Sequence, residues 1–376
     1  MISDLDDSLL SEILEYVGEN QYRFVGVVDR RFNDLYLELF DSYASTYTYV
    51  NASTIEHALI CWRYYKAYDR IDFSWAQRAL CRSAAAYGNL SVLQYLRSIH
   101  CRWDSRTNYK AATNGHLHIL KWAHENGCEL DSHICAIAAK YGHLHVLKWA
   151  REKGCEWDER TCSFAAMNGD LDMLKYARQN HCPWDRKTCM HAVDNGHFDV
   201  LKWARSNGCP WDDSTCSVAA ASGHLEILQW ARENHCPWNT LTCAFAAHCG
   251  QLETLKWART HGCPWDKYTC INAAERGQFD IVKWAHENGC PWDCGVLTWA
   301  ATKGHLNVFQ YAWQNRGDWE LEVEMYNDTL PSHIELWAEE NGCPIRSLIK
   351  RKIVQRRSRM GYKFRYDWTR ISDYIE

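Results

Sequence analysis

The chain repeats itself every 27 residues through most of its length. Glycines recur at this interval, and the sequence around them follows one consensus, C-P-W-D-x-x-T-C-x-x-A-A-x-x-G-H-L-x-x-L-K-W-A-R-E-N-G. A fixed period of this size is typical of solenoids, in which each copy buries its apolar face only by stacking on its neighbours. The repeat glycines are Gly88, Gly115, Gly142, Gly169, Gly196, Gly223, Gly250, Gly277 and Gly304.

Each copy predicts two short helices. An Asp or Asn such as Asp158 stands where a side-chain oxygen caps the first N–H groups of a helix. Trp157 before it and Cys162 after it have the spacing of a hydrophobic staple. An Ala-Ala pair follows and lets helices approach closely, and the repeat glycine ends the helix. The second helix has apolar residues three apart and ends at a glycine such as Gly127, which favours the left-handed conformation.

The composition places this repeat in an intracellular protein. Of 376 residues, 47% are hydrophobic and 24% charged, which suits a folded chain, and the net charge of −5 argues against a protein that coats nucleic acid. The N-terminus lacks the order of a signal peptide, and no apolar run approaches the ~18 residues of a membrane span. An odd count of 19 cysteines then predicts reduced thiols. We expect a cytoplasmic or nuclear location and no membrane partner.

The A-A-x-x-G-H-L centre of each copy resembles the middle of an ankyrin repeat, where the same letters join the two helices. Ankyrin repeats have 33 residues, so the finger-like β-turn would be shortened here to G-C-P-W-D. The family's T-P-L-H opening is absent. The resemblance covers 77–344, about ten copies, and short Trp- and Cys-rich variants like this are similar to ankyrin proteins of giant viruses, algae and stramenopiles. A viral chain would act in the host cell.

The resemblance implies an all-α, ankyrin-like solenoid of stacked helix-turn-helix units. It also implies a concave face, lined by the first helix and the loop before it, that binds a protein target. Specificity in such proteins resides in positions that vary while the frame is fixed, and exposed Phe, Tyr and Met on those positions favour a binding surface. The predicted partner-binding residues are Arg106, Lys110, Arg160, Phe164, Met167, Lys187, His191, Asp194, Phe245, His248, Tyr268, Glu275 and Arg276.

The cysteines and histidines do not predict catalysis or metal binding. Cysteine pairs such as Cys155 and Cys162 have six intervening residues, whereas structural zinc prefers two to four, so we interpret them as small buried apolar residues. The residue after the repeat glycine is His, Asn, Asp or Gln, which indicates a hydrogen-bonding side chain at a turn rather than a base. We therefore expect no enzyme activity, catalytic residue, metal or cofactor.

A ladder of aromatic residues and a stripe of lysines recur on the second helix. We interpret the ladder, from Trp122 to Trp284, as packing between repeats rather than a platform for bases. The lysine stripe is typical of a solvated face, but it keeps open the alternative of a nucleic-acid-binding repeat protein that also uses a basic tail. The stripe consists of Lys121, Lys148, Lys175, Lys202, Lys256 and Lys283.

The two ends differ from the repeat. Residues 1–45 resemble an F-box, although Asp6 replaces the usual Pro, and the resemblance implies docking on a Skp-type adaptor of cullin–RING ubiquitin ligases. The alternative is a plain helical cap. Residues 46–76 connect to the repeats or hold an eroded copy, and the basic residues 345–376 form a C-terminal cap or tail. The adaptor-binding residues would be Leu5, Leu9, Leu10, Ile13, Leu14, Val27, Val28, Phe32 and Leu35.

These patterns together predict a non-enzymatic protein–protein interaction scaffold. The F-box-like segment points further, to the substrate receptor of an SCF-type ubiquitin ligase. Nucleic acid is the less favoured partner.

Overall fold

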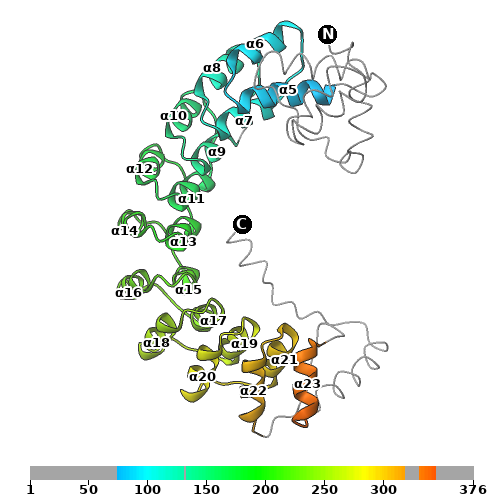
Figure 1. Cartoon of the computed structure of the whole chain (residues 1–376). Helices are drawn as coiled ribbons and strands as arrows, with labels where there is room; N and C mark the ends of the chain where they lie inside the picture. The colour runs from blue at the N-terminus through cyan, green and yellow to red at the C-terminus, as the bar shows by residue number, and fades with distance from the viewer. Residues whose placement is uncertain (1–73, 131–132, 318–329, 344–376) are drawn as a thin grey trace, which may run out of the picture. The chain divides into compact units, whose positions relative to one another are not determined.

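The computed structural model describes residues 74–130, 133–317 and 330–343 (Figure 1). These residues form helices joined by short turns, without a strand, which confirms an all-α solenoid of repeated helix pairs. The F-box-like segment, most of the connecting segment and the basic tail lie outside the described residues. The chain divides into two compact units, which are considered separately: unit 1 ends at Ala192 and includes Asp199–Cys209, and unit 2 holds Val193–Phe198 and the chain from Pro210.

In unit 1 the first helices of the copies form one row and the second helices another (Figure 1). The first helices are α5 (Ser74–Ala86), α7 (Ser105–Thr113), α9 (Ile134–Lys140), α11 (Glu159–Met167) and α13 (Arg186–Asp194). The second helices are α6 (Leu90–Ser98), α8 (Leu117–Glu125), α10 (Leu144–Glu152), α12 (Leu171–Gln179) and α14 (Phe198–Ser206). α5 packs on α7, α7 on α9 and α9 on α11, and each also packs on the second helix of its own copy.

Unit 2 repeats this arrangement. Its first helices are α15 (Asp213–Ala221), α17 (Thr240–His248), α19 (Lys267–Glu275) and α21 (Cys294–Lys303), which pack in that order. Its second helices are α16 (Leu225–Glu233), α18 (Leu252–Thr260), α20 (Phe279–Glu287), α22 (Leu306–Gln314) and α23 (Ser332–Glu340). The copies contact their neighbours in sequence, as expected for a solenoid.

The first helix contributes mainly small side chains to the core of a copy, and the second helix contributes mainly large ones. Ala111 and Ala112 of α7 are fully buried, and so are Ile119 and Leu120 of α8. Alanine adds little bulk, so first helices of neighbouring copies can lie close together, while the branched side chains of the second helix fill the space between them. Buried Ala-Ala pairs recur on the other described first helices, except that Val193 follows Ala192 on α13, and some first helices also bury a large side chain, such as Leu80 of α5 and Ile134 of α9.

The predicted N-cap is confirmed in most copies. Asp158 accepts a hydrogen bond from the backbone N–H of Arg160 at 3.0 Å. The equivalent residues that cap in the same way are Asp185, Asp212, Asn239, Asp266 and Asp293. The prediction is wrong for Asp104, whose side chain makes no capping hydrogen bond.

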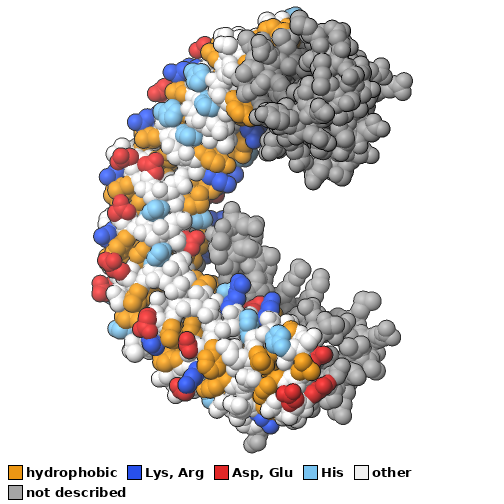
Figure 2. All heavy atoms as spheres, viewed as in Figure 1, with side chains coloured by type: hydrophobic (Ala, Val, Ile, Leu, Met, Phe, Trp, Pro, Cys, Tyr) orange, Lys and Arg blue, Asp and Glu red, His pale blue; other side chains and the backbone are white. Residues whose placement is uncertain are grey.

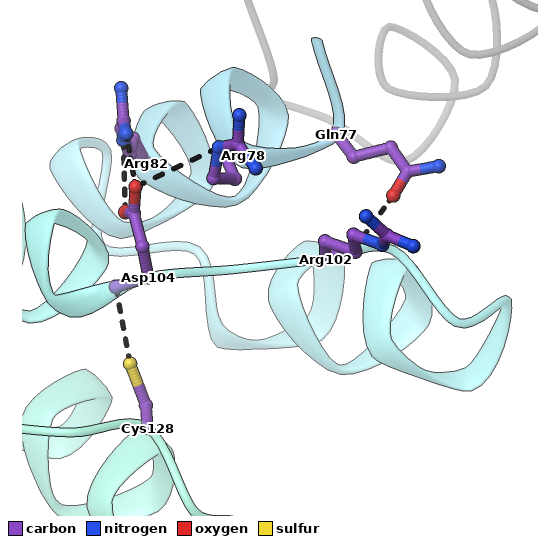
Figure 3. Close-up of polar contacts among 6 residues, drawn as sticks. All are labelled: Gln77, Arg78, Arg82, Arg102, Asp104 and Cys128. Carbon is purple, nitrogen blue, oxygen red and sulfur yellow. Dashed lines mark hydrogen bonds and ion pairs between the residues drawn. The ribbon is translucent and has the colours of Figure 1, made fainter. Parts of the chain in front are cut away.

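Asp104 instead binds two arginines of α5, the first helix of the preceding copy (Figure 3). Arg82 donates to it from Nε at 3.0 Å and from a second guanidinium nitrogen, and Arg78 lies 3.9 Å from the same carboxylate. Charge-assisted, two-pronged pairs of this kind are stronger than a neutral N–H contact, so the arginines outcompete the cap. The side chain of Asp104, the residue before α7, thereby joins α7 to α5.

The left-handed turn after the second helix is confirmed, but glycine does not always occupy it. Gly127, Gly154 and Gly208 have φ near +80°, whereas His181 and His235 hold the same position in their copies with φ of 64° and 62°. A side chain with a Cβ is strained in this region by about 1 kcal/mol. In the copies with these histidines, the backbone at this turn therefore adopts a positive φ that a residue with a Cβ disfavours.

We expect His181→Gly to stabilise unit 1 by about 1 kcal/mol, because the exposed imidazole adds strain at a positive φ. The free energy of unfolding in urea measures the change. The reciprocal variant Gly208→His should lose a similar amount, since a Cβ at Gly208 meets no atom within 4 Å and only the backbone strain changes. Equal stability of His181→Gly and the parent chain would contradict the expectation.

Candidate interaction surface

Buried thiols join each copy to the next. The thiol of Cys135 on α9 lies 3.8 Å from the carbonyl oxygen of Cys155, and Cys182 donates to the carbonyl of Asp158 at 3.3 Å. Burial raises the pKa of Cys135 to about 12, which keeps the thiol protonated and able to donate. The cysteines are therefore buried, as predicted, and their sulfurs also make hydrogen bonds that the staple prediction did not contain. Among the described residues, no three His, Cys, Asp or Glu side chains gather where they could hold a metal ion.

Asn108 takes the place of this cysteine in α7 and makes the same connection. Its amide nitrogen donates to the carbonyl oxygens of Cys128 and Glu129, at 3.2 and 2.9 Å. An amide can thus replace the thiol because the requirement at this position is a buried donor aimed at the following turn. Because asparagine, which has no thiol, fills the same role, the consensus cysteine acts here as a hydrogen-bond donor and not through thiol reactivity.

The residue after the repeat glycine has two different roles. Where it is His, its Nε2 reaches back to a turn carbonyl of the preceding copy, as in His116 to Ala86 at 3.1 Å and His143 to Thr113 at 3.1 Å. Where it is Asn or Asp, it caps its own helix, as Asp170 does by accepting from the N–H of Met173 at 2.8 Å. The predicted hydrogen-bonding side chain is confirmed, and in the histidine copies it acts between repeats.

The aromatic ladder packs against the Trp of the C-P-W-D segment. Trp184 and Trp203 meet edge to face with ring centroids 6.1 Å apart, and Arg178 stacks over Trp184 at 4.2 Å. The guanidinium of Arg178 also donates to the carbonyl of Cys182. This arginine links one copy to the next through the Trp ring, and the ladder consists of packing contacts, as predicted. The one copy with Leu130 in place of the Trp has His124 in place of the arginine.

Three positions of each first helix, four and then three residues apart, form one stripe on its surface. In unit 1 this stripe, here called the basic stripe, holds cations and no carboxylate on α7, α9 and α11. Its residues are Arg106, Lys110, Thr113, His133, Ile137, Lys140, Arg160, Phe164 and Met167. Lys187, His191 and Asp194 occupy the three such positions of α13, so the next first helix along has a carboxylate at its third position.

The same positions in unit 2 hold no Lys or Arg on α15, α17, α19 and α21. Six of the twelve are apolar or aromatic, among them Leu241, which is 39% exposed, and the others are polar residues, Glu275 and Gly295. The stripe, here called the apolar stripe, consists of Ser214, Val218, Ala221, Leu241, Phe245, His248, Tyr268, Asn272, Glu275, Gly295, Trp299 and Thr302. The repeat frame is therefore constant while this surface changes character between the units.

The structure places none of the predicted partner-binding residues in the core. Arg106, Lys110, Arg160, Lys187 and Arg276 are exposed, and the other eight are half-buried. The expectation of exposed Phe, Tyr and Met is wrong, because Phe164, Met167, Phe245 and Tyr268 are half-buried. Lysines lie over two of these rings: the ammonium of Lys140 is 5.7 Å from the centroid of Phe164, and that of Lys267 is 5.7 Å from the centroid of Tyr268.

Several surface residues escaped the sequence prediction. Lys140, Leu241 and Trp299 occupy stripe positions, and Tyr141, which follows Lys140, is 45% exposed. The signal that identifies the first three is their place in the period, since they align with Met167, Tyr268 and Phe245 of other copies. The sequence prediction selected residues whose type is unusual for the repeat. Which residues lie on the helix surface depends instead on their position within the 27-residue period.

Three predicted residues of unit 2, Arg276, His248 and Glu275, lie in ionic or hydrogen-bonded contacts. Arg276 donates from Nε to Nε2 of His248 at 2.9 Å, and Lys303 lies 3.6 Å from the carboxylate of Glu275. Burial and then the Arg276 charge lower the pKa of His248 from 6.5 to about 4. The imidazole is therefore neutral at physiological pH and serves as an acceptor.

We expect this histidine to make unit 2 less stable in mild acid. Above pH 6.5 it is neutral in both folded and unfolded chains, so it adds no pH dependence. As the pH falls from 6.5 towards 4, the unfolded chain binds the proton and the folded chain does not, so the free energy of unfolding decreases. Urea unfolding at pH 7 and pH 5 should show a smaller pH effect in His248→Gln. An unchanged pH effect in that variant would contradict the expectation.

An open hollow lies in the basic stripe between α9 and α11. Its volume is about 210 Å³, and it is lined by His133, Ala136, Glu156, Trp157, Asp158 and Arg160. Arg160 forms a 2.7 Å ion pair with Asp158, and its hydrogen bonds and charge lower the pKa of that carboxyl. The hollow thus combines an aromatic wall with carboxylates, one of which is already paired.

The lysine stripe of the second helices carries acids beside its cations. Lys256 forms an exposed ion pair with Glu253 at 2.7 Å, and acidic residues occupy the position of Glu253 in most copies from Asp172 onward. Figure 2 shows Lys and Arg side chains interspersed with Asp and Glu over the second helices. Mixed charge of this kind gives a solvated face rather than a continuous phosphate-binding surface.

Comparison with known proteins finds ankyrin repeats in the middle of the chain. Residues 134–178, from α9 into α12, match the family model for ankyrin repeats (many copies). This match supports the ankyrin repeat family, and such repeats form protein-interaction scaffolds. No curated protein matches the sequence. No described helix is long and apolar enough to cross a membrane.

Solved structures with a similar chain trace include two kinds of helical repeat. The human ASB11 ankyrin repeat domain is 16% identical with a TM-score of 0.37, and the match covers 42% of this chain and 84% of that one. The maize pentatricopeptide repeat protein PPR10 is 12% identical with a TM-score of 0.36, over 83% of this chain and 54% of that one. The chain thus spans about half of PPR10, and these TM-scores are too low to bear on function.

Proposed function

We propose that this chain is a non-enzymatic scaffold that holds a protein target against the stripes of its first helices. The carrying observation is that the frame residues stay constant while the stripe positions lose their lysines and arginines from unit 1 to unit 2, where each first helix has at least one apolar or aromatic side chain among them. Surface that only had to be solvated has no physical reason to become apolar over several consecutive copies. In stacked repeats, such variable positions are where partners are selected.

A photo-crosslinking experiment tests the scaffold proposal. Benzoylphenylalanine replaces Phe164 on α11 in one variant and Tyr176 on α12 in a matched control, since both rings are half-buried and belong to the same copy. Irradiation in a cell extract should give protein adducts from the first-helix position only, and nuclease treatment should not remove them. Adducts that disappear with nuclease would favour the nucleic-acid alternative. Absence of adducts at Phe164 would overturn the proposal.

The finer form of the proposal is a substrate receptor of an SCF-type ubiquitin ligase. It rests on the F-box-like sequence of residues 1–45, in which Leu9, Leu10 and Ile13 would enter the groove of a Skp-type adaptor. The repeats would then only raise the effective concentration of the target near the ligase. Retention of the adaptor by the intact chain, and not by a chain without residues 1–40, is the expected result. Equal retention, or none, would reduce the segment to a helical cap.

A further inference from the structure

We propose that the basic stripe of unit 1 binds an extended, acidic protein segment with a carboxylate at about every third residue. This inference rests on the proposed scaffold function and names the chemistry of its target. Arg106 and Lys110 of α7, Lys140 of α9 and Arg160 of α11 carry the stripe's fixed positive charge. The equivalent positions of unit 2 hold no Lys or Arg, so the charge is a property of these copies and not of the repeat frame.

The cations at the α7 end of the stripe are not neutralised within the described part of the chain. Arg106 and Lys110 are exposed and form no ion pair there, in contrast to Arg82, whose charge is taken up by Asp104. The ammonium of Lys140 lies over two rings, 5.7 Å from the centroid of Phe164 and 6.0 Å from that of Tyr141, and forms no ion pair with a described residue. An approaching carboxylate can therefore bind these cations without first breaking an existing ion pair.

The spacing of the helices sets the spacing of the acids. α7 packs on α9 and α9 on α11, and packed helices lie roughly 8–10 Å apart. A chain in the extended polyproline II conformation advances about 3.1 Å per residue with three residues per turn, so every third side chain lies on the same face about one helix spacing further along. A segment with a carboxylate at every third residue would meet cations on each helix in turn. Its intervening residues would lie over Phe164 and Met167, which are half-buried and apolar.

The hollow between α9 and α11 favours a peptide over a nucleic acid. The carboxylates of Glu156 and Asp158 line it beside Trp157. A polyphosphate that crossed α11 would bring its charges next to these carboxylates, which is repulsive. A peptide has backbone N–H groups that can donate to them, while its acidic side chains bind the cations on either side.

Fluorescence anisotropy with the full chain tests this inference. The probe is a labelled peptide of about ten residues, enough to span three helices, with Glu at every third position and Leu and Ser between. The control peptide has the same composition with its Glu residues clustered at one end. A labelled single-stranded RNA of about ten nucleotides completes the set. We expect the spaced peptide to bind at least roughly tenfold more tightly than either control.

Two triple variants of equal charge identify the surface. Arg106→Gln, Lys110→Gln and Lys140→Gln together should weaken the spaced peptide by roughly tenfold or more. Lys121→Gln, Lys148→Gln and Lys202→Gln remove three exposed charges from the second helices and should change binding by no more than about twofold. Circular dichroism checks that both variants remain helical.

The inference is overturned by four outcomes: no binding of the spaced peptide, equal binding of the clustered peptide, equal losses in the two triple variants, or RNA that binds more tightly and displaces the peptide. The crosslinking experiment separates this failure from that of the scaffold proposal. Protein adducts at Phe164 without acidic-peptide binding would retain the scaffold and reject the acidic target. No adducts would reject the scaffold itself.

Discussion

Gly115→Ala should cost about 3 kcal/mol of folding free energy, whereas Gly142→Ala, at the same position of the next copy, should cost about 1 kcal/mol. Both glycines have positive φ, 72° and 76°, so both variants carry the backbone strain. A Cβ at Gly115 would also lie 2.7 Å from Nδ1 of His143, which reaches back from the following copy, while a Cβ at Gly142 meets nothing within 4 Å. Denaturant unfolding measures the difference.

The contact with His143 can be tested directly. In a His143→Ala background the ring is gone, so Gly115→Ala should then cost only the backbone strain of about 1 kcal/mol. The same background should leave the cost of Gly142→Ala unchanged, since a Cβ there meets nothing within 4 Å and Asp170, the residue equivalent to His143 in the next copy, caps its own helix. Equal costs for the two glycine variants in the parent chain would mean that the ring moves aside freely and that the contact between copies is unimportant.

Phe309→Ala should destabilise the C-terminal end of unit 2 by about 3–5 kcal/mol. Phe309 on α22 is fully buried, and its ring meets Trp337 of α23 edge to face at 5.6 Å. Because copies in a solenoid contact only their neighbours, the loss should be local. Hydrogen exchange should show faster exchange in α22 and α23, with α15 to α18 nearly unchanged.

Phe245→Ala is the matched control for this variant. Phe245 is also a phenylalanine of unit 2, but it lies half-buried on the surface of α17, so its loss should cost less than about 1 kcal/mol. Uniformly faster exchange throughout unit 2 in Phe309→Ala would show that the copies unfold as one cooperative block. No change in α23 would show that the contact with Trp337 does not hold that helix.

The period of the sequence was sufficient to predict the helix pairs, because a repeated pattern fixes the same local preference many times. Copies that depart from the consensus were less predictable. Asp104 has the sequence of an N-cap, and only the presence of Arg82 one copy earlier changes its role. His116 and Asp170 occupy one slot, yet they bind different copies, since imidazole is long enough to reach back and a carboxylate is suited to capping.

The interaction surface was harder to predict for a related reason. Chemical type identified Arg106 and Phe164, but it missed Lys140, which completes the charge of the basic stripe. The stripe emerges only when each residue is assigned to a position on its helix and then compared across copies. Burial also had to be seen in the structure, because the half-buried ring of Phe164 lies beneath Lys140 of the preceding copy.

The back-reaching histidine has a consequence for how such chains can be shortened or lengthened. Where a copy has this histidine before its second helix, the ring occupies the space beside the repeat glycine of the preceding copy. The preceding copy must therefore have glycine at that place for the two copies to stack. The junction between Gly142 and Asp170 lacks that requirement, because the space beside Gly142 is open. Cutting or duplicating the array at this junction therefore leaves no ring without its place, and the new neighbour has only to offer Asn168 the two helix-end carbonyls that Ala139 and Lys140 offer it here.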